Sequence, residues 1–192
     1  MDYVVAVEGL DSIDLREVPD QIRRFASIAV NATARKFRTE SSRRIREQIA
    51  FPAQYLDSKS TGNLKVVKNA TADAMEAVIQ GRFRATSMTR FIKGSKAAGR
   101  KGVTVEVAKG QRQKMNRAFI MNLRSGNVGL AIRLKEGERI ENKTRMVRMN
   151  SGLYLLYGPS VDQVFRSVAE DVKDDAGDYL EQEFIRLSEA LT

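Results

Sequence analysis

The hydrophobic pattern predicts a long amphipathic helix near the start of the chain. Over residues 19–49, apolar side chains recur mostly three, four or seven to eight positions apart, and most of the basic side chains lie off that stripe. Pro19 suits the first turn of a helix, and Pro52 ends the pattern. At 1.5 Å per residue such a helix would be roughly 45 Å long, which is longer than a compact domain of this size requires.

A second amphipathic helix is predicted at the end of the chain. Apolar residues keep helical spacing from Val161 to Leu191, and acidic residues occupy the opposite face. Ser160 is a favourable N-cap, and Gln163, three residues later, completes a capping-box pattern. The helix should therefore begin sharply, directly after Ser160.

The tripeptide Gly158, Pro159 and Ser160 has a predicted structural role in front of this helix. We expect Gly158 to permit an unusual backbone turn and Pro159 to end the preceding strand. The hydroxyl of Ser160 then caps the helix. No catalytic role is needed to explain these three residues.

Short apolar runs predict β-strands in the rest of the chain. The runs cover residues 3–8, 64–69, 74–80, 103–107, 119–123, 128–134 and 153–157. The turn residues Ser125, Gly126 and Asn127 join two of them into a hairpin with one apolar face. Residues 74–80 fit a helix equally well, whereas the continuous apolar run at 153–157 favours a central strand.

This order of elements predicts an α+β fold in a single domain over residues 1–192. A small antiparallel or mixed β-sheet would be packed by the long N-terminal helix and the C-terminal amphipathic helix. Glycines and basic residues dominate the stretch between the predicted strands, so we expect a flexible, extended basic arm at about 84–117. A second basic segment, at about 135–150, is expected to be a loop.

Composition removes most catalytic and metal chemistry from consideration. The 192 residues include no Cys and no His, which excludes disulfides, thiolate or imidazole metal ligands, cysteine nucleophiles and Ser-His-Asp arrangements. A metal cluster at four acids of the second helix is disfavoured, because their spacing is typical of a solvated helix face; these are Asp171, Asp174, Asp175 and Asp178. We therefore expect no cofactor, no metal and no enzymatic activity, and a carboxylate-based enzyme is the weakest alternative.

No part of the sequence predicts contact with a membrane. No window approaches the roughly 18 to 20 apolar residues needed to cross a bilayer. Residues 1–10 lack a basic region followed by an apolar run, so they do not read as a secretory signal. We expect the protein to fold in a cytoplasm.

Charge is distributed very unevenly along the chain. The net charge is +9, but residues 82–148 hold 18 basic and 4 acidic residues, and residues 160–192 hold 3 basic and 9 acidic ones. Such an asymmetry is typical of proteins that bind a polyanion or an oppositely charged neighbour. The acidic second helix is a candidate surface for the basic middle of a neighbouring copy, which would give a head-to-tail ring.

The basic middle contains the candidate binding residues. Three interpretations fit them about equally: a solvated loop, a surface for docking on an acidic protein, or a patch that binds nucleic acid without sequence preference. Few aromatic residues lie nearby, which disfavours a platform for stacking single-stranded bases. The candidates are Arg90, Lys93, Lys96, Arg100, Lys101, Lys109, Arg112, Lys114 and Arg117.

The second half contains a series of short motifs in a fixed order. They are Ala118-Phe-Ile-Met121, Arg124-Ser-Gly-Asn127, Val128-Gly129, Arg133 and Leu156-Tyr-Gly-Pro-Ser-Val161. This series resembles the minor tail protein Z family of tailed bacteriophages, whose pattern has a Phe-Ile strand, a glycine turn, a glycine-containing return strand that ends in a basic residue, and a Gly-Pro-Ser element before a C-terminal helix. The resemblance covers about residues 115–165 by motif, and the N-terminal half fits it in outline.

The resemblance implies a structural virion protein of the tail or neck, such as one that completes the tail or joins it to the head. Its partners would be copies of itself in a ring around the DNA channel, with a hexamer favoured, and neighbouring neck or tail proteins. Nonspecific contact with double-stranded DNA in the channel is compatible with this picture, and a membrane is not part of it. Such a protein would assemble in the bacterial host cytoplasm and reside in the virion. The main alternative is a free, nonspecific nucleic-acid-binding protein.

Overall fold

The computed structural model describes residues 3–6, 17–94, 102–135, 137–138, 145–150 and 152–190. The chain divides into two compact units. Unit 1 contains residues 1–45, 56–82 and 162–192, and unit 2 contains residues 46–55 and 83–161. The expectation that the chain forms a single domain stays a prediction.

Two long helices and a small sheet make up unit 1. The helices are α1 (Asp20–Gln48), which extends beyond the unit at its C-terminal end, and α2 (Val161–Glu189). The strands are β1 (Tyr3–Ala6), β2 (Leu64–Lys68) and β3 (Glu76–Gly81), in the order β1-β3-β2 with antiparallel pairing. These bounds confirm both predicted helices, and they show that residues 74–80 contribute a strand rather than a helix.

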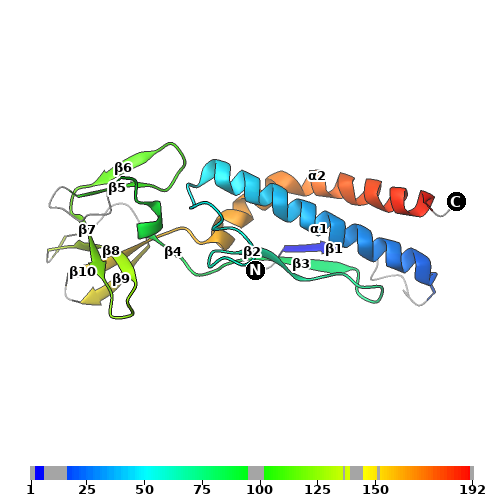
Figure 1. The fold of residues 1–192 in the computed structure, drawn as a ribbon, viewed down its shortest axis with the longest axis horizontal. Coiled ribbons are helices and arrows are strands. Elements are labelled where there is room, and N and C mark those ends of the chain that lie inside the picture. Colours follow the sequence, from blue (N-terminus) through cyan, green and yellow to red (C-terminus); the bar gives the residue numbers. More distant parts are fainter. Residues whose placement is uncertain are drawn as a thin grey trace. The chain divides into compact units, whose positions relative to one another are not determined.

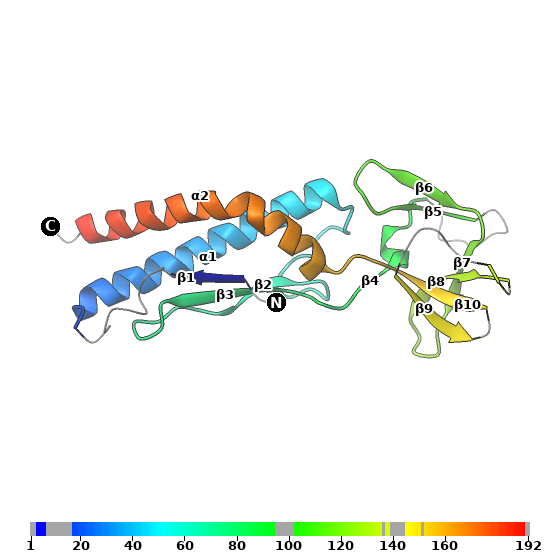
Figure 2. The same ribbon diagram turned by 180° about the vertical axis from the view of Figure 1, so that it is seen from behind.

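The helix α1 lies between α2 and the sheet in both Figure 1 and Figure 2. Its contact with α2 includes the rings of Phe37 and Phe165, whose centroids are 6.2 Å apart in an edge-to-face arrangement. On its other side, the amide group of Asn31 exchanges two 2.9 Å hydrogen bonds with the backbone of Ala70, in the connection between β2 and β3. Arg38 donates to the carbonyl oxygens of Leu64 and Leu56. Polar side chains of α1 therefore fix its position on the backbone around the sheet.

Unit 2 is mainly β-structure. Its five-stranded sheet has the order β4-β10-β8-β7, and β9 pairs with β10. These strands are β4 (Thr86–Ser87), β7 (Ala118–Asn122), β8 (Val128–Arg133), β9 (Arg145–Asn150) and β10 (Leu153–Gly158). A separate hairpin is formed by β5 (Val103–Glu106) and β6 (Arg112–Met115), and a 3₁₀ helix, η2 (Met88–Phe91), follows β4.

The structure confirms the predicted hairpin and the predicted central strand. In the turn between β7 and β8, the N–H of Leu123 donates to the carbonyl oxygen of Asn127 at 2.8 Å. Strand β10 pairs with β8 and β4 on one side and with β9 on the other. A fully apolar run suits this position, because both edges of the strand are occupied and its side chains are largely covered.

Two segments that were expected to be irregular contain regular structure. The described part of the stretch 84–117 includes β4, η2, β5 and β6, and its side chains Phe91, Val103 and Val105 are buried. Residues 145–150, expected to belong to a loop, instead form β9. Both segments are rich in Arg and Lys, which conceals the strand pattern, because only the pairing with neighbouring strands makes these residues regular. Residues 95–101 lie outside the described part of the chain.

Candidate nucleic-acid and partner interface

Six of the nine candidate cations lie in the described part of unit 2. Arg90 is in η2, Lys93 follows it, and Lys109 lies in the turn between β5 and β6. Arg112 and Lys114 are on β6, and Arg117 directly precedes β7. Lys96, Arg100 and Lys101 are outside the described residues. The question for the other six is whether each cation is available to a partner or already occupied within the unit.

A buried glutamate occupies two of these cations. Glu106, at the end of β5, is 8% exposed and accepts hydrogen bonds from the N–H of Gly110 at 3.1 Å and from Nε of Arg112 at 3.3 Å. The Nζ of Lys93 lies 4.0 Å from the same carboxylate. The bond from Gly110, followed by that from Arg112 and the charge of Lys93, lowers the pKa of Glu106 even though burial opposes this shift. Arg112 thus joins β6 to β5, and Lys93 joins the segment after η2 to the same hairpin.

Arg117 is committed to a second glutamate. Its guanidinium pairs with both carboxylate oxygens of Glu138 and donates to the carbonyl oxygen of Arg133 at 2.9 Å. The same carboxylate accepts a 2.9 Å hydrogen bond from the N–H of Lys135. The bond from Arg117 and then the one from Lys135 lower the pKa of Glu138 to about 2. Arg117 therefore connects the segment after β8 to the segment before β7.

Arg90 lies on an aromatic cluster. Its guanidinium carbon is 4.9 Å from the centroid of the Tyr55 ring, at a distance typical of cation–π contacts. Tyr55 stacks on Phe51 at 5.3 Å between centroids, and Phe51 lies 5.5 Å from Phe91. All three rings are buried, so this cluster is part of the core of unit 2 and offers no exposed surface for stacking bases.

The cations that remain available are spread more widely than the nominated set. Lys109 and Lys114 are exposed on the β5–β6 hairpin and form no ion pair within the described residues. Six further cations of unit 2, which are not among the nine candidates, are also exposed and form no ion pair within the described residues. They are Arg84, Arg124, Arg133, Lys135, Arg145 and Arg148. Sequence reasoning also missed the two glutamates, although Glu106 is conspicuous as the only acid between residues 82 and 135. A single acid within a basic stretch is a signal of an internal ion pair.

The predicted glycine turn has a different structural explanation. Gly158 is the last residue of β10 and is not among the described glycines with positive φ. A Cβ atom at this position would lie 2.6 Å from Cε2 of Phe91, which is fully buried. Close packing of this ring, rather than an unusual turn, therefore requires a glycine. Pro159 follows and accepts a 3.3 Å hydrogen bond from the N–H of Thr86 at its carbonyl oxygen. Ser160 is buried and directly precedes α2, and its role as the helix cap stays a prediction.

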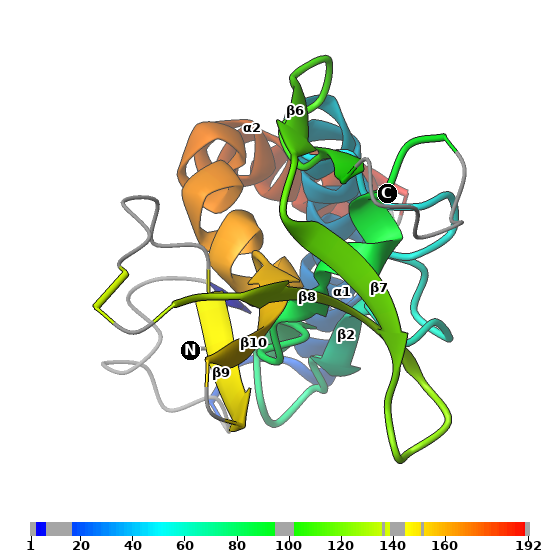
Figure 3. The same cartoon turned by 90° about the vertical axis from the view of Figure 1, so that its left-hand side faces the viewer.

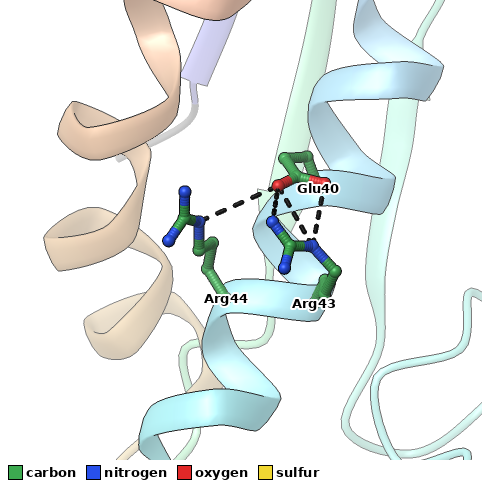
Figure 4. Close-up of polar contacts among 3 residues, drawn as sticks. All are labelled: Glu40, Arg43 and Arg44. Atoms are coloured by element: carbon green, nitrogen blue, oxygen red, sulfur yellow. Dashed lines mark hydrogen bonds and ion pairs between the residues drawn. The ribbon is translucent and has the colours of Figure 1, made fainter.

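Unit 1 presents acids on its helices. Glu40 of α1 is held by Arg43, whose Nε lies 3.1 Å from both carboxylate oxygens, and Nε of Arg44 lies 3.8 Å away (Figure 4). The hydrogen bond from Arg43 is the main reason that the pKa of Glu40 is lowered. Glu40 also lines a groove of about 280 Å³ between α1 and α2, together with Asp175 and Asp178 of α2. Three carboxylates thus lie beside Lys36 and apolar side chains in the lining of this groove.

The four aspartates of α2 lie on the exposed side of the helix. Asp171, Asp174, Asp175 and Asp178 are all exposed, in agreement with their interpretation as a solvated face. Within the described ranges, no group of three or more acids is arranged to hold a metal ion. Neither long helix contains, in its described residues, a stretch apolar enough to cross a bilayer.

One comparison with known proteins assigns the chain to a family. The family model described as prophage minor tail protein Z matches residues 4–191, which is nearly the full chain. No curated protein and no solved structure matches it. The match extends the resemblance seen at residues 115–165 to both helices and to both compact units. The chain therefore belongs to the prophage minor tail protein Z family, whose members are structural proteins of the phage tail.

Proposed function

We propose that this protein is a tail-completion or neck component that assembles with copies of itself into a ring around the DNA channel, with six subunits as the favoured number. Family membership supports a structural role in the tail. The observation that carries the proposal further is the opposite net charge of the two compact units. Unit 2 contains 18 basic and 5 acidic residues, whereas unit 1 contains 15 basic and 19 acidic residues.

Opposite charges on one chain favour association between copies. The basic surface of one copy attracts the acidic surface of the next, which is a heterologous contact, and repeated heterologous contacts close into a ring when the rotation permits. The exposed aspartates of α2, two of which line the groove, provide the acidic surface. The exposed cations of unit 2 outside the β5–β6 hairpin, such as Arg84 and Arg124, provide the basic one.

The test is the mass of the purified protein by light scattering over a range of concentrations and salt. We expect a multimer at high concentration that dissociates as salt rises, because exposed charges are screened over about 10 Å at 0.1 M. The variant Asp174→Asn/Asp178→Asn removes two exposed acids of α2 and should raise the concentration needed for assembly about tenfold. Its matched control, Glu17→Gln/Asp73→Asn, removes two exposed acids outside α2 and should assemble normally.

Two results would contradict the proposal. One is a monomer at every concentration together with absence of the protein from purified tails. The other is equal assembly of the α2 variant and its control, which would show that the acidic face of α2 makes no contribution.

Nonspecific binding of double-stranded DNA is a second candidate function. The specific observation in its favour is the pair of exposed lysines on the β5–β6 hairpin, Lys109 and Lys114, which have no ion-pair partner among the described residues. The buried aromatic cluster around Tyr55 favours contact with phosphates over stacking on bases. Within a ring, the same surface would face the genome.

A further inference from the structure

We propose that copies of this chain associate through the edges of the five-stranded sheet in unit 2, with β9 of one copy pairing antiparallel with β7 of the next. The inference rests on the self-assembly proposed above and adds a second contact, between sheet edges, to the charged contact described there. The sheet would then continue from subunit to subunit.

The first argument is the pairing of the two outer strands. Strand β7 pairs with β8, and β9 pairs with β10, and neither pairs with any other described strand. In Figure 3, β7 and β9 lie on opposite sides of the sheet. Each strand therefore presents a row of backbone N–H and C=O groups that can pair with a further strand. Their lengths match, with five residues in β7 and six in β9.

Strand direction supplies the second argument. The pairs β7–β8, β8–β10 and β10–β9 are all antiparallel, so β7 and β9 run in opposite directions within one copy. When the next copy is related by a rotation about an axis roughly along the strands, its β7 arrives antiparallel to the first copy's β9. The alternation of directions then continues unbroken, and the same contact can be repeated around a ring.

Exposed apolar side chains lie on the edge strand β9 and on β8 beside the other edge strand, β7. Among the described residues of unit 2, four large hydrophobic side chains are exposed by more than 40%: Phe83, Val128, Val147 and Met149. Val147 and Met149 are on β9, and Val128 pairs with Asn122 at the end of β7. Three of the four thus lie at or beside the proposed contact, where pairing would remove them from water.

Charge decides between the possible pairings of edges. Strand β9 contains Arg145 and Arg148, whereas β7, with the sequence AFIMN, contains no charged residue. Pairing β9 with another β9 would bring arginines of two copies together, which is unfavourable. Pairing β7 with β7 would leave Val147 and Met149 exposed. Only the β7–β9 contact covers both edges without repulsion.

Engineered disulfides test this contact directly, because the chain contains no cysteine. Phe119, Ala131, Leu155 and Val147 form one row across the four strands, so Phe119 and Val147 point to the same face of the sheet. We would combine Val147→Cys with Phe119→Cys in one double variant and with Met121→Cys in another. After oxidation of the multimer, at least one double variant should give a ladder of dimers, trimers and larger species on a non-reducing gel.

The single variants and a second double variant serve as controls. Each single variant should stay monomeric on the gel, since a β7–β9 contact brings two different positions together. A dimer from Val147→Cys alone would instead indicate β9–β9 pairing and overturn the proposal. The variant Val67→Cys/Ile185→Cys has two cysteines at similarly exposed positions in unit 1 and should give no ladder. If the ring closes, the longest species gives the number of subunits.

A charge substitution gives an independent readout. Met149→Lys should lower the mass of the multimer to that of a monomer at the same concentration, whereas Ile28→Lys, at an equally exposed position on α1, should not. A multimer that survives Met149→Lys and yields no ladder from either double variant would refute the edge contact and leave self-assembly intact. A wild-type protein that is monomeric at every concentration would refute the self-assembly itself, and the edge contact with it.

Discussion

At the scale of single residues, several side chains with an obvious interaction role are already used inside the fold. Arg112 and Arg117 belong to the basic cluster, yet each is bound to a glutamate, Glu106 and Glu138 respectively. The first pair joins β6 to β5, and the second joins the segment after β8 to the segment before β7. Lys109 and Lys114, by contrast, remain exposed. Fewer of the nine candidate cations are therefore available to a partner than the sequence indicates. More cations outside that set are available.

Gly158 allows a residue-scale prediction. Replacing it with alanine would place a Cβ atom 2.6 Å from Cε2 of Phe91, and this ring cannot move easily because it is fully buried against Phe51. Overpacking of this kind costs about 1–3 kcal/mol. We expect Gly158→Ala to lower the free energy of unfolding by that amount, measured by denaturant titration.

The control is the same substitution at Gly177, inside α2. Apart from the adjacent residues and the backbone of α2 itself, no atom lies within 4 Å of a Cβ placed there, and alanine is favoured over glycine in a helix by up to about 1 kcal/mol. Gly177→Ala should therefore stabilise the protein slightly. Equal stability of the two variants would refute the steric explanation for Gly158.

At the scale of elements, burial follows the helical period only in part. Phe37 and Ile45 of α1 are buried as their spacing suggests, whereas Ile22 and Ile28 of the same expected stripe are more than 40% exposed. The buried face instead includes small polar residues such as Thr33 and Ser41. Small side chains at these positions allow neighbouring elements to approach α1 closely, which a hydrophobicity pattern does not report.

The start of α2 gives an element-scale prediction. Ser160 directly precedes the helix and is buried, and the loss of a serine cap costs about 1 kcal/mol. For a chain of this length, that corresponds to a fall of roughly 2–4 °C in melting temperature. Thermal unfolding of Ser160→Ala should show this fall, and Ser160→Thr, which retains a hydroxyl, should show less.

Ser167→Ala is the matched control for the cap. Ser167 lies inside α2 and donates to the carbonyl oxygen of Val164 at 2.8 Å, a bond that the helix does not require. Its replacement should leave the melting temperature nearly unchanged. A Ser160→Ala protein that melts like the wild type would show that the hydroxyl does not cap the helix.

At the scale of the whole molecule, the two compact units differ in the sign of their net charge. Unit 2 has a net charge of +13 and unit 1 a net charge of −4. A single strongly positive unit suits contact with DNA, and the opposite signs suit contact between copies. The two contacts respond differently to substitution, so they can be separated experimentally.

The DNA candidate predicts a particular dependence on salt. If Lys109 and Lys114 each contact a phosphate, Lys109→Ala/Lys114→Ala should reduce the slope of log K against log salt by about 0.9 for each lysine. Fluorescence anisotropy with a duplex of arbitrary sequence measures this slope. The control Lys59→Ala/Lys65→Ala removes two lysines of unit 1 and should leave it unchanged. An unaltered slope in the first variant would exclude the hairpin from DNA contact.

Much of the fold was determined locally, and so the sequence was sufficient to predict it. Both long helices, the β7–β8 hairpin and the central position of β10 follow from spacing, turn residues and an unbroken apolar run. Family-specific motifs at residues 115–165 also identified the class of protein, which the match over residues 4–191 confirmed.

Only the tertiary structure decided which charged residues are available and where the sheet ends. Strand β9 is a strand because β10 lies beside it, Arg117 is occupied because Glu138 reaches it from 21 positions away, and Gly158 is required because Phe91 packs on it. Each of these features depends on residues distant in the chain. A periodic pattern reports which face of its own element a residue occupies. Ion pairs, strand edges and close packing depend instead on which other element packs against that residue.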